Sequence, residues 1–308
     1  MVVPVDTAGV GDGVVVVGSL NADLAVPVGA LPVAGQTVAA TGEVVRGPGG
    51  KGANQAVGLA RLGRSTAMVG AVGDDPEGAL LRSTLAGEGV DVTHVATVGA
   101  PTGLAVVLVH GAESTIVVAA GANGTVDGAR VRSAGGVVGA AAAVVTQCEV
   151  PDAALVAAAE LTTGLFVVNP APARPLPPAV LARADLLVPN RGELAALAGA
   201  PEPDGVEAVV DQARAVRPAA TTVVTCGADG AVVVEPHRVV VVPAAPADPV
   251  DATAAGDSFV AALVDAVVGG ADVADAARWA VRVAALTVGR PGAMTALPHR
   301  AEVGPRPE

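Results

Sequence analysis

Short runs of apolar residues recur along the chain, and most of them end in glycine or in small polar residues. The run Val14–Val17 is continuous and β-branched, which is typical of a strand buried on both faces of a mostly parallel sheet. The same pattern predicts strands at Ala67–Val72, Val144–Gln147, Leu165–Val168, Leu186–Val188, Thr222–Thr225 and Ala231–Val234. Helical segments such as Asp152–Leu161 separate several of these strands. This alternation predicts an α/β fold with a doubly wound sheet.

A second pattern lies outside that alternation. The segments Thr102–His110 and Thr115–Ala119 flank a tip at Gly111–Glu113, as in a β-hairpin. Together with extended residues between Ala25 and Val45, the hairpin predicts a small separate sheet, which could close over a site as a lid. We therefore expect one α/β domain over residues 12–300, with a lid formed by residues 22–48 and 101–121.

Composition excludes several classes of function. The 308 residues can bury roughly three quarters of their unfolded surface, and only 1% of them are aromatic, so stacking platforms for nucleic acid are not expected. The net charge of −12 argues against a polyanionic partner and against an anionic membrane surface. A small anion held locally by helix ends remains compatible with this charge.

Neither a secretory signal nor a membrane span is predicted. The first 13 residues lack a basic segment and a long apolar segment, and the longest apolar stretch, Ala134–Val145, is well short of the ~20 residues that cross a bilayer. The two cysteines, Cys148 and Cys226, are too few for a disulfide scaffold and suit a reducing compartment. We expect a cytoplasmic protein.

The stretch Asp251–Phe259 joins an extended segment to the apolar run Phe259–Val268, which predicts a buried helix. Small residues at Ala254, Ala255 and Gly256 would then lie at the helix N-terminus, where unpaired backbone N–H groups bind anions. Asp257 beside such an anion hole suggests phosphoryl transfer to a hydroxyl, with Asp257 as the base. The alternative is that Asp257 only caps its helix, which contributes about 0.5–2 kcal/mol.

A glycine-rich stretch, Gly47–Asn54, leads into a helix of small residues. It contains the dinucleotide-binding spacing G-x-G-x-x-G, yet the residues before it are too polar for a central strand, and it lacks the Ser or Thr of a P-loop. Our interpretation is a backbone that approaches a ligand closely, with Lys51 and Asn54 as polar contacts. A purely structural glycine turn is the alternative.

Polar residues stand where two predicted strands end. Asn21 and Asp23 follow the first strand, and Glu149 follows Val144–Gln147. Ligands of α/β sheets usually bind at this edge, so these side chains are candidates to hold the hydroxyls of a polyol. For Asn21 and Asp23, a local Asx-type turn is the alternative.

Two further stretches carry both a structural and a functional interpretation. Asn190 and Glu193 have the spacing of a helix capping box, but Glu193 could also hold a water bound to Mg²⁺ near phosphates. The turn Cys226–Gly230 could cover a nucleotide, or it could be a glycine turn without a ligand.

Taken together, these stretches resemble the ribokinase-like sugar kinase family. The motifs that carry the resemblance run in the family's order over about Val14–Pro298, and they are Asn21–Asp23, Gly49–Asn54, Asn169–Ala173, Asn190 with Glu193, and Asp251–Phe259. The resemblance implies an α/β/α fold with a β lid, ATP-dependent phosphorylation of the 5-hydroxyl of ribose, and a homodimer joined through the lids.

The resemblance also assigns roles to residues by position. It places the sugar against Asn21, Asp23, Gly49, Gly50, Lys51, Asn54 and Glu149. It places ATP against Asn190, Glu193, Thr225, Cys226, Gly227, Ala228, Asp229, Gly230, Gly256 and Val281, and forms the anion hole from Ala254, Ala255 and Gly256. Asp257 would contact the sugar and act as the base.

A monovalent cation, usually K⁺, is a further expectation from the family, beside Mg²⁺. The matching positions are Asp251, Thr253, Thr287, Arg290, Gly292 and Ala296. Ala296 stands where the family pattern has a serine, and Val281 where it commonly has a histidine beside the adenine. These departures bear on cation affinity and on nucleotide fit, respectively.

Three alternatives remain at this stage. A kinase of the same fold could act on another pentose, a ketose or a nucleoside. The glycine-rich stretch could serve a nicotinamide-dependent oxidoreductase. The chain could also be a sugar sensor without catalysis, although the presence of Gly256 and Asp257 argues against it.

Overall fold

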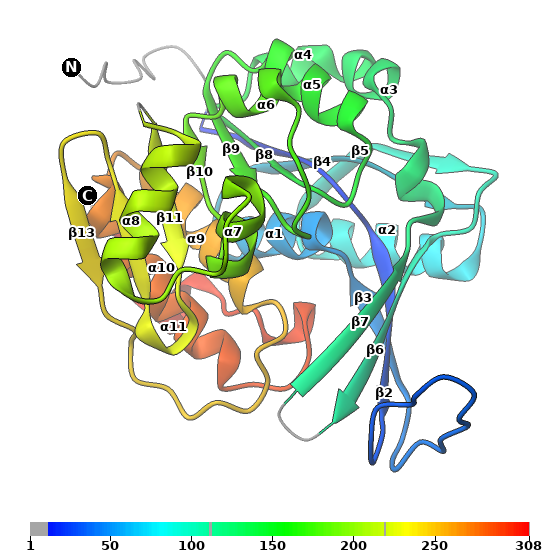
Figure 1. The fold of residues 1–308 in the computed structure, drawn as a ribbon. Helices are drawn as coiled ribbons and strands as arrows, with labels where there is room; N and C mark the ends of the chain where they lie inside the picture. Colours follow the sequence, from blue (N-terminus) through cyan, green and yellow to red (C-terminus); the bar gives the residue numbers. More distant parts are fainter. Residues whose placement is uncertain (1–11, 111–112, 219, 308) are drawn as a thin grey trace.

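The computed structural model describes residues 12–110, 113–218 and 220–307, and Figure 1 shows their arrangement. Within these ranges nine strands form one sheet in the order β13-β12-β11-β10-β9-β8-β1-β4-β5. Its strands are β1 (Val14–Val17), β4 (Thr66–Gly73), β5 (Val90–Val98), β8 (Ala143–Gln147), β9 (Leu165–Asn169), β10 (Leu186–Leu187), β11 (Thr221–Thr225), β12 (Ala231–Val234) and β13 (Val239–Val242). Neighbouring strands from β5 to β11 are parallel, whereas β12 and β13 are antiparallel additions. The doubly wound sheet is confirmed, with a mixed edge.

Helices cover both faces of this sheet (Figure 1). One face carries α1 (Lys51–Arg61), α2 (Pro76–Gly87), α9 (Ala255–Val268) and α10 (Val273–Val288). The other carries α3 (Gly128–Ser133), α4 (Gly135–Gly139), α5 (Asp152–Leu161), α6 (Pro178–Arg183), α7 (Arg191–Ala198) and α8 (Gly205–Val216). The short α11 (Arg300–Val303) follows near the C-terminus. In β1, Val14 and Val16 enter one core and Val15 and Val17 the other, as expected for a strand buried on both faces.

A second sheet of four strands projects from the main one in Figure 1. It consists of β2 (Asn21–Pro27), β3 (Val45–Gly49), β6 (Gly103–His110) and β7 (Glu113–Ala119), in the order β3-β2-β6-β7. The predicted hairpin is therefore present, although part of its tip, residues 111–112, lies outside the described residues. Most of residues 28–44 form an exposed loop instead of the expected extended segment, because only Val28 and Ala40 pair there.

The core follows the composition. Val, Ala and Leu fill it, and the two largest fully buried side chains are Trp279 and Phe166. Cys148 and Cys226 are both free and buried, as expected. Among the described residues we find no helix with the length and apolar character needed to cross a bilayer.

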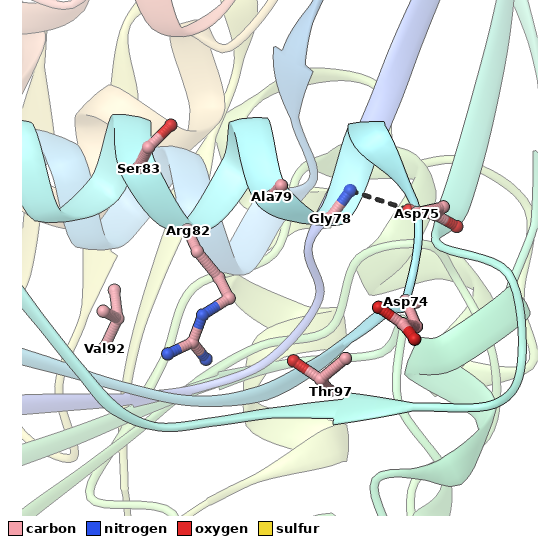
Figure 2. Close-up of a pocket in the computed structure, with 9 residues that line it drawn as sticks. Asp74, Asp75, Gly78, Ala79, Arg82, Ser83, Val92 and Thr97 are labelled. Carbon is pink, nitrogen blue, oxygen red and sulfur yellow. Dashed lines mark hydrogen bonds between the residues drawn. The ribbon is translucent and has the colours of Figure 1, made fainter.

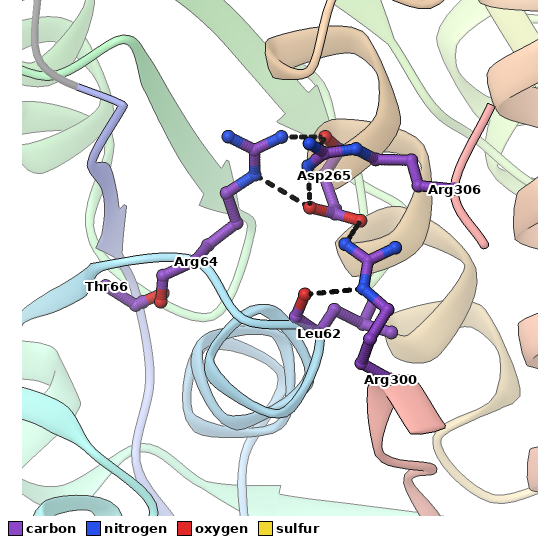
Figure 3. A network of polar contacts seen from close by, with 6 residues as sticks. All are labelled: Leu62, Arg64, Thr66, Asp265, Arg300 and Arg306. Carbon is purple, nitrogen blue, oxygen red and sulfur yellow. Dashed lines mark hydrogen bonds and ion pairs between the residues drawn. The ribbon is translucent and has the colours of Figure 1, made fainter. Parts of the chain in front are cut away.

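A buried ion cluster joins the C-terminal residues to the end of α9 (Figure 3). The carboxylate of Asp265 is inaccessible to solvent and accepts from Arg64 Nε at 2.7 Å, Arg300 Nη2 at 2.8 Å and Arg306 Nη1 at 2.9 Å. Arg64 also donates to the backbone oxygen of Asp265 at 2.6 Å. Cations near a helix C-terminus also offset the negative end of its dipole, so the cluster stabilises α9 from outside the site described next.

Candidate active site

The candidate base, Asp257, lies in the first turn of α9, which begins at Ala255 and thus earlier than the apolar run suggested. It does not cap the helix, because Ala254 is the N-cap residue and no side chain bonds the cap. Instead Asp257 is 6% exposed, and its carboxylate accepts from Asn54 Nδ2 and Gln55 Nε2, both at 3.0 Å. The capping alternative for Asp257 is therefore wrong.

The residues predicted to form an anion hole lie at the same helix end. Within the described part of the chain, the backbone amides of Gly256 and Asp257 have no hydrogen-bond acceptor, whereas Ala255 N donates to Ala252 O. Gly256 is exposed to solvent, and a Cβ atom there would meet no other atom within 4 Å. Ala254 adopts a left-handed conformation with φ of 59°, which turns the chain into the helix. Free amides and open space together suit a phosphate.

Glu149 lies beside the N-terminus of α1. It accepts from the hydroxyl of Ser19, from Asn21 Nδ2 at 3.4 Å and from the backbone N–H of Lys51 at 3.2 Å. The carboxyl ends of β1 and β8 are adjacent in the sheet, which explains how residues 130 positions apart meet. The structure thus brings Asn21 and Glu149, predicted from the strand ends, together with Lys51, predicted from the glycine-rich stretch.

Tight backbone packing surrounds these side chains. Asn21 Oδ1 accepts from Asn123 Nδ2 at 2.7 Å, and Asn123 also bonds both backbone groups of Leu20. Gly50 has φ of 92°, and a Cβ there would lie 2.7 Å from the amide nitrogen of Asn21. A Cβ at Gly49 would lie only 2.0 Å from Asp23 Oδ2. These glycines let β3 and the start of α1 approach the polar side chains.

Negative charge accumulates around one lysine. Burial, followed by the nearby carboxylates of Glu149 and Asp257, raises the pKa of Asp23 to about 7. Burial opposes the charge on Lys51, but Asp257, Glu149 and Glu193 outweigh it and raise the pKa of Lys51. Lys51 is therefore cationic at neutral pH and is the positive group among four carboxyl side chains.

The predicted nucleotide residues lie at the ends of β10 and β11. Asn190 and Glu193 form the capping box of α7, with both bonds at 2.8 Å, and Asn190 pairs with Thr225 through a backbone bridge. Burial raises the pKa of Glu193, and Asp257 adds to the effect. The capping box is confirmed, and a role for Glu193 near Mg²⁺ stays a prediction.

The turn after β11 contains the other predicted nucleotide contacts. Gly227 (φ of 58°), Ala228 and Asp229 form a short 3₁₀ turn that closes when Cys226 N donates to Gly230 O. Asp229 pairs with Arg191 of α7 at 2.7 Å, which holds this turn beside the capping box. Val281 lies on α10, partly buried against the core. Its contact with a nucleotide stays a prediction.

Three of the predicted cation-binding residues meet where the loop before α9 contacts the loop after α10. Asp251 accepts from the amides of Thr253 at 2.8 Å and Gly292 at 2.9 Å. Thr287 and Ala296 are buried, and Arg290 pairs with Glu302 at 2.6 Å. The described residues contain no metal-binding group of three or more His, Cys, Asp or Glu side chains.

A separate hollow of about 470 Å³ lies between α2 and β5 (Figure 2). None of the predicted site residues lines it. Asp75 at its rim caps α2 by accepting from Gly78 N at 2.8 Å, and Pro76 occupies the first helical position. We assign this hollow a structural origin.

Sequence reasoning did not select three of the side chains at the site, Ser19, Gln55 and Asn123. All three are buried and bond directly to predicted residues. Gln55 directly follows Asn54 in the glycine-rich stretch, so its position in the motif was the available signal.

Comparison with known proteins places this geometry in a family. The model of the pfkB family carbohydrate kinases matches residues 11–300. The chain belongs to this family. This carbohydrate kinase is 36% identical to a ribokinase of Bacillus subtilis over 293 residues, covering 94% of this chain and 97% of the relative. It is 34% identical to a ribokinase of Haemophilus influenzae, and the match covers 93% of this chain and 95% of the relative.

Solved structures agree with the fold. The structure of Arabidopsis thaliana ribokinase complexed with ribose and ATP superposes with a TM-score of 0.86 at 31% identity, covering 94% of this chain and 97% of the other. These comparisons confirm the ribokinase-like resemblance and the class of enzyme. The nicotinamide alternative is wrong, because the glycine-rich stretch begins within β3 of the small sheet and does not follow a strand of the parallel sheet.

Proposed function

We propose that this carbohydrate kinase transfers the γ-phosphoryl group of ATP to the 5-hydroxyl of D-ribose, with Asp257 as the general base. The observation that carries the proposal is the position of Asp257 at the start of α9. This buried residue lies beside backbone amides that have no acceptor among the described residues, and its carboxylate bonds Asn54 of the predicted sugar site. Relatives named ribokinase, and the Arabidopsis complex with ribose and ATP, support the choice of substrates.

Positioning supplies most of the catalysis. Asn21, Asp23, Lys51 and Glu149 offer donors and acceptors to the sugar hydroxyls, which fixes the reactive hydroxyl near Asp257. The carboxylate then accepts the hydroxyl proton as the oxygen attacks the γ-phosphorus. A base in this position typically contributes about 10²–10⁴-fold to the rate.

The anion hole stabilises the charge that spreads over the transferred group. Because the amides of Gly256 and Asp257 have no acceptor among the described residues, they would be free to bind the phosphoryl oxygens when these arrive. Mg²⁺ would neutralise charge on the phosphates, and one oxygen of Glu193 remains available for a magnesium-bound water, since Glu193 Oε2 accepts from Asn190 N.

A K⁺ ion beside the anion hole is the proposed role of the loop around Asp251. The loop bonds hold its carboxylate and backbone in place near the start of α9. Ala296 offers no hydroxyl to such an ion, so we expect an affinity below that of a chain with serine there.

A homodimer joined through the lids is the proposed assembly. The small sheet exposes apolar side chains that a monomer would leave in water, including Val45 (61% exposed), Ile116 (53%) and Val117 (62%). Neighbouring apolar patches of this kind mark protein interfaces. Closure of the same sheet over the sugar is the proposed lid motion.

A reducing, cytoplasmic location stays a prediction from the use of cysteine.

The test measures ADP release from ATP with D-ribose, Mg²⁺ and K⁺, for the wild type and for Asp257→Asn. We expect ribose-dependent ADP release in the wild type and a loss of about 10²-fold or more in the variant. Unchanged turnover in the variant would show that Asp257 is not the base. Turnover with another pentose, a ketose or a nucleoside, but not with ribose, would keep the kinase and change the substrate. Ribose binding without turnover would favour a sensor.

A further inference from the structure

The candidate base is held by a side chain that the proposed chemistry does not use. Gln55 lies in α1, inaccessible to solvent, and its Nε2 donates to Asp257 Oδ1 at 3.0 Å and to Asn169 Oδ1 at 3.1 Å. Its Oε1 accepts from Gln147 Nε2 at 2.6 Å. The nitrogen of the Gln55 amide therefore donates two hydrogen bonds, and its oxygen accepts one.

The side-chain amides of Gln147 and Gln55 form a hydrogen-bonded chain that ends at Asp257, which we call the amide chain. The groups at its two ends fix which way the Gln55 amide faces. A carboxylate can only accept, so Asp257 requires the nitrogen of Gln55 to face it. Gln147 donates to the oxygen of Gln55 from the other side, and Asn169 donates its own N–H to Val188 O at 2.8 Å. A flipped Gln55 would place its oxygen against two acceptors, which is unfavourable in a buried position.

The sheet provides the anchor for the chain. Gln147 and Asn169 are the paired last residues of β8 and β9, so their side chains are set by the register of two central strands. Gly18 leaves room for this arrangement, because a Cβ there would lie 2.0 Å from Gln147 Oε1. Asp257 is therefore connected to the rigid sheet through Gln55, while Asn54 holds its other oxygen.

We propose that Gln55 is a positioning residue for Asp257: the hydrogen bonds from Gln147 through Gln55 aim the carboxylate at the reacting hydroxyl. The proposal rests on the proposed function, in which Asp257 is the base. A donor to the ionised form lowers the pKa of a carboxyl group, and loss of that donor raises it. A base whose aim is lost by even a small displacement loses rate without losing nucleotide affinity.

Other charges around Asp257 stay unchanged when Gln55 is replaced. They are Lys51 on α1, Asp23 on β2, Glu193 on α7 and, beyond Lys51, Glu149 after β8. A change in the pH profile of a Gln55 variant therefore reports on the amide that was removed.

The experiment compares Gln55→Met, which keeps the length of the side chain but has no donor, with Gln147→Met and with the control Thr146→Val. Thr146 is equally buried on β8, and its hydroxyl has no partner among the described residues, so its loss leaves the amide chain intact. Steady-state rates are measured against pH for each variant, after circular dichroism and thermal unfolding have established that it is folded.

For Gln55→Met we expect kcat to fall about 10–100-fold with KM for ATP within about twofold of the wild type. The acid limb of kcat/KM should move up by about one pH unit. Gln147→Met should shift the limb in the same direction by less, and Thr146→Val should leave it in place. Gln55→Glu, which restores the shape with a second carboxyl, should move the limb further than Gln55→Met, because adjacent carboxylates raise one another's pKa.

A folded Gln55→Met enzyme with the wild-type kcat and pH profile would overturn the proposal, and so would a fall in kcat with no movement of the acid limb. Asp257→Asn separates this failure from that of the proposed function. If Asp257→Asn is inactive while Gln55→Met is normal, only the role of Gln55 is wrong. If Asp257→Asn is fully active, both assignments are wrong.

Discussion

Helix α9 carries a buried aspartate near each end, and the two have opposite surroundings. Asp265 meets three guanidinium groups (Figure 3), whereas Asp257 meets two side-chain amides and, among the described residues, no ion pair. Guanidinium groups neutralise a carboxylate permanently, which suits a structural role. Amides hold it in place but leave it able to accept a proton. Burial alone therefore does not decide what a carboxylate does, and its donors do.

The largest effect on stability should come from removing Asp265, the aspartate in the ion cluster; we call its end of α9 the inert end and that of Asp257 the reactive end. Asp265→Ala leaves Arg64 buried without its carboxylate, which we expect to lower the free energy of unfolding by about 3–5 kcal/mol. Urea denaturation measures the loss. The control, Glu160→Ala, breaks an exposed pair with Arg132 and should cost about 0–1 kcal/mol. Equal small losses in both variants would show that the buried cluster contributes no more than a surface pair.

The reactive end should respond in the opposite way. Asp257→Asn keeps the shape of the side chain and removes one negative charge from a crowded site, so we expect the free energy of unfolding to change by less than about 1 kcal/mol while kcat falls about 10²–10⁴-fold. Thermal unfolding and steady-state kinetics on the same preparation test this separation. A variant that lost stability in parallel with activity would make Asp257 a structural residue like Asp265.

Acidity around the reactive end gives a pH-dependent contrast. Because the pKa of Asp23 is raised to about 7 in the folded chain, mainly by burial, the folded chain binds a proton that the unfolded chain releases near pH 4. This contribution to stability is present at low pH and is lost as the pH rises toward and through 7. Asp23→Asn should therefore raise the Tm at pH 8 more than at pH 5, by about 2–4 °C for each kcal/mol of strain removed. An increase that is the same at both pH values would contradict the raised pKa.

The smallest effect concerns the backbone at the two ends of α9. A residue with a left-handed backbone lies just outside each end: Ala254, with φ of 59°, precedes the helix, and Gly270, with φ of 96°, follows it. Ala254→Gly should raise the free energy of unfolding by roughly 0.5–1 kcal/mol, and Gly270→Ala should lower it by about 1 kcal/mol. Differential scanning calorimetry distinguishes the two signs. A loss of stability in Ala254→Gly would show that the alanine methyl group contributes packing that exceeds its strain.

The sequence predicted the parts of the fold whose patterns are local. Continuous apolar runs located the central strands, since a strand buried on both faces needs no polar residue. The edge strand β5 was missed because it mixes Val with Asp91, Thr93 and His94, a pattern that also fits a loop. The prediction of extended residues between Ala25 and Val45 was wrong for most of residues 28–44, which form a loop where Val33, for example, is 69% exposed.

The candidate site divides in the same way. Asn21, Lys51, Glu149 and Asp257 stood next to strand ends or helix starts, so their meeting followed from the α/β topology. Ser19, Gln55 and Asn123 make hydrogen bonds to residues between 92 and 202 positions away in the sequence, and no periodicity marks them. The roles of the predicted residues in binding stay predictions until the variants above are measured.

The bond between Asn54 and Asp257 also has a consequence for how the enzyme forms. It joins residues 203 positions apart, on the first and ninth helices. Closing so long a loop costs entropy before it brings any gain, and contacts of this kind slow folding. During synthesis, the apolar face of α1 stays exposed until α9 has been made, because α9 is the helix that packs against it. The emergence of catalytic activity is thus a late event in folding, and it serves as a reporter that the whole sheet and both helical layers are in place.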